Sequence, residues 1–247
     1  MKWAAIIFFI IVFGAWFYNG GAKDEITELV TQGNIKELKD KIDDSNVNHP
    51  NADGHTPLEV AVIHGHLDIV KFLLGKGAIF KKDRKESLLH YAVIMGDINV
   101  AEYLLSLGAD VNWINEKNVS LLARALFNDD LKMTKLLVRH NVNINGRSFI
   151  EELQIPEFAV LRNDLEIVKT LIEKGGLDPN YTDKRGITLF MHAAARGRQE
   201  IMDYLIQKNV DPNVVSPKGL TACDYARMSK RKVWIPSCSP NPKSLHE

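Results

Sequence analysis

Residues 53–61 read DGHTPLEVA, and residues 65–74 read GHLDIVKFLL. The first segment contains Thr56, a typical N-cap residue, and Pro57, whose missing N–H costs nothing in the first turn of a helix. Gly65 can end that helix in a left-handed conformation. The second segment carries one apolar stripe at helical spacing, formed by Leu67, Val70, Leu73 and Leu74. Together the two segments predict a pair of short helices.

The same pattern returns along the chain. Residues 87–92 read SLLHYA, residues 120–125 read SLLARA and residues 186–194 read GITLFMHAA. A small residue recurs at the corresponding position with a period of about 33 residues, at Ala61, Ala92, Ala125, Ala159, Ala193 and Ala226. Because a single unit cannot bury its apolar face alone, the units are expected to stack on their neighbours.

These motifs resemble the ankyrin-repeat family, and the resemblance covers most of the chain after Ala22. It implies an all-α fold, a solenoid of helix-turn-helix units with β-turn loops. We expect about six and a half repeats over residues 23–232, the last of which keeps only its first helix. The unit after Asn145 lacks the usual motif, which predicts a distorted loop or an altered stacking angle there. Residues 233–247 contain three prolines and predict an irregular tail.

A hydrophobic helix is expected before the repeats, because residues 3–18 form an unbroken apolar run preceded by Lys2. Two interpretations of residues 1–22 stay open: a signal peptide cleaved after Ala22, or an uncleaved membrane anchor whose last aromatic residues lie at the interface. A buried core helix is disfavoured, since the run has no polar face. The positive start of the chain predicts that the rest is exported. In a Gram-negative bacterium it would be periplasmic, soluble after cleavage or tethered to the inner membrane.

Composition and motifs argue against several functions. The 247 residues carry 31 basic and 31 acidic side chains, a balance that argues against nucleic-acid binding. The sequence has no closely spaced cysteine pair and no His-Glu-x-x-His motif, so we expect no metal site. It has neither a Gly-x-Ser-x-Gly elbow nor a phosphate-binding glycine loop. We therefore expect no catalytic residues, no cofactor and no enzymatic activity.

Two cysteines and a basic cluster have structural interpretations. Cys223 lies at the core position of the last unit, and we expect a buried, unpaired thiol there. A disulfide with Cys238 in an oxidising compartment is the alternative. The basic cluster Arg227, Lys230, Arg231 and Lys232 is expected to be a solvated helix end, with contact to anionic lipid as the alternative.

The resemblance implies that a partner protein binds at the turn tips and at the concave face of the first helices. In each repeat, the recurring alanine and the residue after it are followed by two positions that face that concavity. The first is occupied by Ile63, Ile94, Phe127, Leu161 and Ala195, and the second by His64, Met95, Asn128, Arg162 and Arg196. Four large apolar residues in the first position predict an interaction strip, beside a second position that becomes basic at one end.

The turn tips add aromatic and apolar residues of the kind enriched in binding hot spots. The alternative for the aromatic residues is packing on neighbouring turns. The predicted partner-binding residues are Ile63, Ile94, Met95, Trp113, Phe127, Phe149, Ile150, Leu161, Arg162, Tyr181 and Arg196.

The leading hypothesis is an exported bacterial ankyrin-repeat protein that binds another protein. Its role would be that of an immunity protein neutralising a toxin such as a lipase, because exported bacterial members of the family include such cases. A periplasmic scaffold or stress-protection adaptor for an enzyme is the alternative. A structural role at the membrane surface, using residues 1–22 and the basic cluster, is a weaker one.

Overall fold

A computed structural model describes residues 24–80, 87–145, 154–235 and 238. The hydrophobic helix expected within residues 1–22, the predicted contact residues Phe149 and Ile150, and most of the expected irregular tail lie outside these ranges. Within them, every helix is too short or too polar to cross a membrane.

The described residues form thirteen short helices, which confirms the expected all-α fold. They are α2 (Glu25–Thr31), α3 (Ile35–Lys41), α4 (Pro57–Ile63), α5 (Leu67–Gly75), α6 (Leu88–Met95), α7 (Ile98–Ser106), α8 (Leu121–Phe127), α9 (Leu131–Arg139), α10 (Ile155–Arg162), α11 (Leu165–Glu173), α12 (Leu189–Arg196), α13 (Gln199–Gln207) and α14 (Ala222–Met228). The chain divides into two compact units, Met1–Lys81 and Lys82–Glu247.

The first unit contains two helix pairs, α2 with α3 and α4 with α5, and α2 packs against α4. The start of α4 follows the sequence pattern. Thr56 accepts a hydrogen bond from the backbone N–H of Glu59, and the Glu59 carboxylate accepts one from the N–H of Thr56 at 2.7 Å. Gly65 follows the helix with a φ of +72°. The predicted N-cap and the helix-ending glycine are therefore confirmed.

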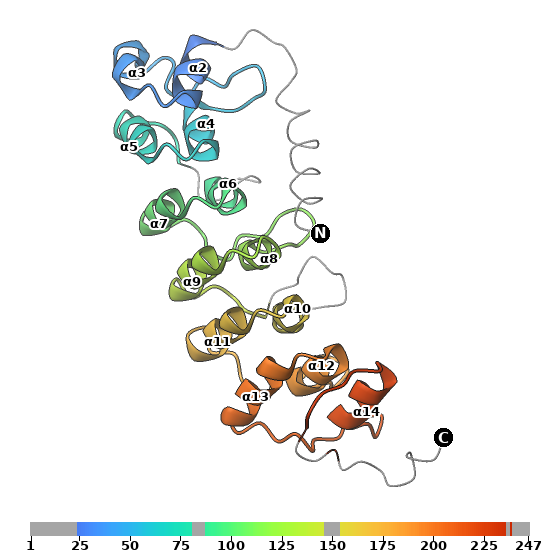
Figure 1. The fold of residues 1–247 in the computed structure, drawn as a ribbon. Coiled ribbons are helices and arrows are strands. Elements are labelled where there is room, and N and C mark those ends of the chain that lie inside the picture. Colours follow the sequence, from blue (N-terminus) through green and yellow to red (C-terminus); the bar gives the residue numbers. More distant parts are fainter. Residues whose placement is uncertain (1–23, 81–86, 146–153, 236–237, 239–247) are drawn as a thin grey trace. The chain divides into compact units, whose positions relative to one another are not determined.

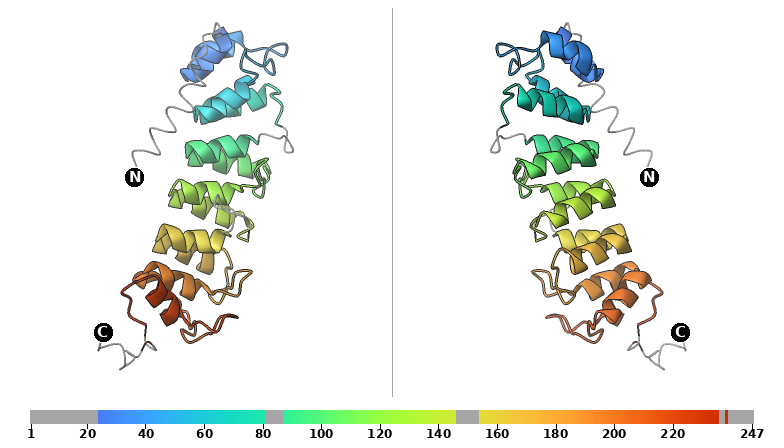
Figure 2. Two further views of the ribbon diagram at one scale, coloured as in Figure 1. Left: turned by 90° about the vertical axis from the view of Figure 1, so that its right-hand side faces the viewer. Right: turned by 90° about the vertical axis from the view of Figure 1, so that its left-hand side faces the viewer.

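The second unit stacks its helix pairs in two layers (Figures 1 and 2). The first helices α6, α8, α10, α12 and α14 pack on one another in order, and so do the second helices α7, α9, α11 and α13. Close packing is possible because Ala92, Ala125 and Ala193 are fully buried between the helices. Ile114 pairs with Ser120 and Thr182 with Thr188 as isolated β-bridges, which close the turns between consecutive repeats.

The last repeat, which contains α14, differs from one expectation. Cys223, in α14, forms a disulfide with Cys238, so the prediction of an unpaired thiol is wrong. The pairing is possible because the chain turns back after α14. The side-chain amide of Gln199 exchanges two hydrogen bonds with the backbone of Trp234, at 2.8 and 3.0 Å, and Ile235 is buried. In the described part of the chain no second helix follows α14, and the returning segment contacts the start of α13.

Candidate functional site

We call the carboxyl ends of the first helices in the second unit, from Ile94 and Met95 in α6 to Ala195 and Arg196 in α12, the first-helix surface. Apart from Ile63, the predicted interaction strip lies on this surface. Met95 ends α6 and Phe127 ends α8, and their side chains are 38% and 44% exposed. Asn128 Nδ2 donates to the carbonyl oxygen of Ile94 at 3.4 Å and so links the two helix ends. Ile94 itself and Leu161 are half-buried. Large apolar side chains thus reach solvent on adjacent helices.

Two of the predicted contact residues, Ile63 and Arg162, differ from this pattern. Ile63 is the half-buried last residue of α4 and belongs to the first unit. Arg162 forms an ion pair with Asp129, in which its Nε donates to Oδ1 at 2.9 Å. This pair joins the ends of α8 and α10. The charge of Arg162 is therefore balanced within the fold, which leaves it a smaller role in attracting a partner.

The two turn-tip aromatic residues make equivalent contacts. The rings of Trp113 and His90 lie 4.5 Å apart between their centroids, and the Tyr181 hydroxyl donates to Glu157 Oε1 at 3.1 Å. His90 and Glu157 occupy the same position of their first helices, three residues after the N-cap. Both aromatic residues are half-buried and contact first helices rather than neighbouring turns, and their role in partner binding stays a prediction.

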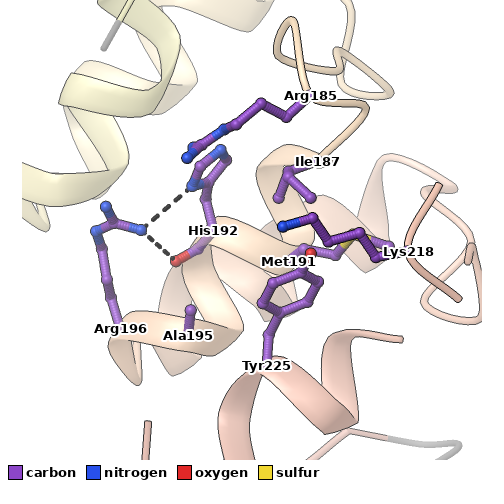
Figure 3. Close-up of a pocket in the computed structure, with 8 residues that line it drawn as sticks. All are labelled: Arg185, Ile187, Met191, His192, Ala195, Arg196, Lys218 and Tyr225. Atoms are coloured by element: carbon purple, nitrogen blue, oxygen red, sulfur yellow. Dashed lines mark hydrogen bonds between the residues drawn. The ribbon is translucent and has the colours of Figure 1, made fainter. Parts of the chain in front are cut away.

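The α12 end of the first-helix surface contains a buried polar network, of which Figure 3 shows Arg185, His192 and Arg196. Asp183 Oδ1 accepts hydrogen bonds from the backbone N–H groups of Arg185 and Ile187, at 2.8 and 2.9 Å. Its Oδ2 is 3.0 Å from Arg185 Nη2 and 3.1 Å from His192 Nε2. On the other side of the ring, Arg196 Nη1 is 3.2 Å from His192 Nδ1. One carboxylate therefore organises both the turn and the histidine.

The hydrogen bonds assign the state of His192. A guanidinium only donates, so Nδ1 accepts from Arg196 and Nε2 carries the hydrogen that it donates to Asp183. Burial lowers the pKa of His192 below its ordinary value, and the positive charge of Arg196 adds to that effect. Burial alone would raise the pKa of Asp183, but hydrogen bonds from Ile187 and Arg185 outweigh it, so the pKa is lowered. His192 is neutral and Asp183 ionised near neutral pH.

Glu157 is the second carboxylate of the network. Its side chain is 1% exposed, and among the described residues no donor reaches its Oε2. Burial raises the pKa of Glu157, and the nearby charge of Asp183 acts in the same direction, although the hydrogen bond from Tyr181 opposes them. The carboxyl group consequently holds a proton to higher pH than an exposed glutamate does.

Glu157, Asp183 and His192 each place one possible metal ligand within 4.8 Å of the others. The donor atoms, however, are already used by the protein. His192 Nε2 carries a hydrogen, Asp183 Oδ2 accepts from Arg185, and the guanidinium of Arg196 lies beside the ring. Two neighbouring positive charges oppose a cation there. The arrangement is that of a hydrogen-bond network rather than a metal centre.

Beside this network lies a pocket of about 240 Å³, which we call the α12–α14 pocket. It is lined by Arg185, Ile187, Met191, His192, Ala195, Arg196, Lys218 and Tyr225 (Figure 3). Of these, Arg196 is a predicted contact residue, and Ala195 occupies the first of the two concave positions of its repeat. Arg185 and Lys218 were missed, although each directly precedes the glycine of its turn, Gly186 and Gly219. Basic residues at the same turn position of consecutive units are the signal that could have found them.

Comparison with known proteins gives consistent matches. The family model "Ankyrin repeats (3 copies)" matches residues 18–115 and 157–234, and a model of the LRRK2 ANK repeat matches residues 77–184. The chain is 26% identical over 186 residues to the Ankyrin repeat and KH domain-containing protein mask-1 of Caenorhabditis elegans, covering 74% of this chain and 7% of that protein. It is 28% identical over 195 residues to a putative ankyrin repeat protein of Rickettsia felis, covering 72% and 47%. The chain thus spans less than half the length of these two relatives.

Among solved structures, the human ASB11 ankyrin repeat domain aligns with a TM-score of 0.60 and 22% identity, covering 82% of this chain and 91% of that one. At this identity the likeness shows the fold alone.

Proposed function

The chain belongs to the ankyrin-repeat family, whose fold is non-catalytic and binds proteins, and from this premise we propose that its first-helix surface binds a partner protein. The proposal includes the turn tips as the edge of the contact. The proposed contact lies within the second unit, where the first helices from α6 to α14 pack on one another in order.

The observation that carries the proposal is the exposure of Met95 and Phe127 at the ends of adjacent helices. Exposed apolar patches on monomeric proteins mark interaction sites, and methionine and aromatic residues are enriched in interfaces. Both side chains stand on helices held by a buried core, so little backbone ordering opposes binding.

The test is affinity capture of the tagged chain from its own cells, with quantitative mass spectrometry of the captured proteins. Met95→Gln combined with Phe127→Ser should release a partner that the wild type retains. The control is Leu107→Gln, which changes an exposed apolar residue at the end of the second helix α7, outside this surface. A partner captured equally by the wild type and by the Met95/Phe127 variant would contradict the proposal.

We propose further that residues 1–22 direct export of the repeats. The apolar run behind Lys2 supports this. The Cys223–Cys238 disulfide supports it independently, since disulfides persist mainly in oxidising compartments such as the periplasm. Cell fractionation and mass analysis of the amino terminus test the proposal and separate a cleaved signal from an inner-membrane tether. Finding the uncleaved chain in the cytosol would contradict export.

For the exported binder we propose the role of an immunity protein that neutralises a toxin. A toxin gene beside its own gene, together with protection of cells that co-express the two, would support this role. A captured periplasmic enzyme whose survival under stress depends on the chain would instead support the scaffold or adaptor role.

A further inference from the structure

The α12–α14 pocket is bordered by positive side chains, two of which form no ion pair with the described residues. The charge of Arg185 is compensated by Asp183, whose side chain is 7% exposed. For Arg196 and Lys218, by contrast, no carboxylate of the described residues lies within ion-pair distance. Figure 3 shows Lys218 reaching from its turn toward α12, and Arg196 beside His192. Two cations therefore border one small cavity.

Arg196 is held in place before any ligand arrives. Its Nη1 lies 3.3 Å from the carbonyl oxygen of His192 and 3.2 Å from His192 Nδ1. A guanidinium has five N–H donors, so most of them stay available for a ligand. Burial lowers the pKa of Arg196, and the positive charges of Arg198 and Arg185 lower it further, although the charge of Glu157 opposes them. A negative group placed at the pocket would relieve this unfavourable environment.

The size and floor of the pocket restrict its occupant. Ile187 and Met191 are 7% and 1% exposed and, with Ala195, provide apolar surface beneath the cations. A volume of about 240 Å³ lies below the range of roughly 300–1,000 Å³ that is usual for small-molecule sites. It is suited to a single amino-acid side chain that carries a negative end and apolar methylene groups.

We propose that the α12–α14 pocket binds an aspartate or glutamate side chain of the partner polypeptide, with Arg196 and Lys218 contacting its carboxylate. This rests on the proposed function, and it adds the chemistry of one anchor residue. Ala195 and Arg196 belong to the first-helix surface, so the pocket lies at its basic end. An acidic residue seated there would fix the direction of the partner along the surface.

The experiment screens a library of phage-displayed random peptides against the full chain, purified in mild detergent and immobilised. Lys218→Glu is the main variant, because Lys218 is an exposed turn residue whose change leaves the core intact. Lys184→Glu is the matched control, an exposed lysine of the preceding turn that does not line the pocket. Arg196→Gln is the second pocket variant.

We expect the selected peptides to carry an acidic residue beside an apolar one. Replacing that acid by its amide, or changing Lys218→Glu, should weaken binding about tenfold, whereas Lys184→Glu should leave it unchanged. A peptide in which lysine replaces the acid should recover affinity for Lys218→Glu, which a damaged fold could not produce.

Selected peptides without acidic enrichment, equal affinity for wild type and Lys218→Glu, or no selected peptide at all would each overturn the pocket proposal. None of these outcomes tests whether the first-helix surface binds a partner protein. That proposal is tested separately by the capture experiment with the Met95/Phe127 variant.

Discussion

The two ends of the first-helix surface occupy equivalent places in the repeat and differ in chemistry. At the α6–α8 end, the exposed positions hold Met95 and Phe127. At the α12–α14 end, the same positions hold Ala195 and Arg196, beside the basic pocket. The repeated backbone thus fixes where a side chain points, whereas the residue at each position decides what it can bind.

The two ends also differ in what holds them together. The α6–α8 end relies on apolar packing and on the tilted contact between the rings of His90 and Trp113. The α12–α14 end adds the Asp183 network and the Cys223–Cys238 disulfide. Since α14 packs on α12 without a second helix behind it in the described residues, the disulfide segment compensates for a missing neighbour.

The largest effect is expected from removing core volume at the α6–α8 end. Leu122 is fully buried in α8, so Leu122→Ala should lower the free energy of unfolding by about 2–5 kcal/mol, as cavities in packed cores do. Urea unfolding followed by circular dichroism measures the change. Leu107→Ala, at a partly exposed position, is the control and should cost less than about 0.5 kcal/mol. Equal losses for the two variants would remove the distinction between core and surface at this end.

The next effect concerns the disulfide at the opposite end. The two cysteines are separated by 15 residues, a loop whose closure is worth about 3 kcal/mol through the unfolded state. Cys238→Ser should therefore destabilise the chain and increase hydrogen exchange in α14 more than in α6. The wild type with reductant should behave as Cys238→Ser does. Unchanged exchange in α14 would show that the last unit is held by packing alone.

A pH experiment isolates the buried carboxyl group of Glu157. Its pKa is raised from 4.5, so the folded state keeps the proton to higher pH than the unfolded state. The resulting stabilisation is fully present below pH 4.5 and is lost as the pH rises through the folded pKa. Glu157→Gln stays neutral and still accepts from Tyr181.

The stability of Glu157→Gln relative to the wild type should therefore rise between pH 4.5 and 8, by about 1.4 kcal/mol for each unit by which the pKa is raised. Thermal unfolding across this range measures it. A difference between the two proteins that does not change with pH would mean that Glu157 ionises normally.

The smallest effect is expected at the boundary between the two ends. Arg162→Gln removes the partly exposed ion pair with Asp129 and should cost about 0.2–1 kcal/mol at low salt. The loss should shrink in high salt, because ions screen exposed pairs. Thermal melts at two salt concentrations measure it, with Lys184→Gln as the control. A salt-independent loss would indicate packing by the Arg162 stem instead.

The sequence by itself determined the repeat and its helices. Helix starts such as Thr56 with Pro57, and helix ends such as Gly65 and Gly197, depend on the local backbone, so short motifs reveal them. The period then places equivalent residues, and with them the first-helix surface, at equivalent points of each unit.

Only the tertiary structure decided the contacts between residues far apart in the chain. Tyr181 meets Glu157 across 24 positions, and Cys223 meets Cys238 after the chain turns back. Lys218 joins Arg196 at one pocket because α14 packs on α12. Such contacts depend on how the units stack and on where the chain turns, which local propensity does not specify, so the pocket became visible only in three dimensions.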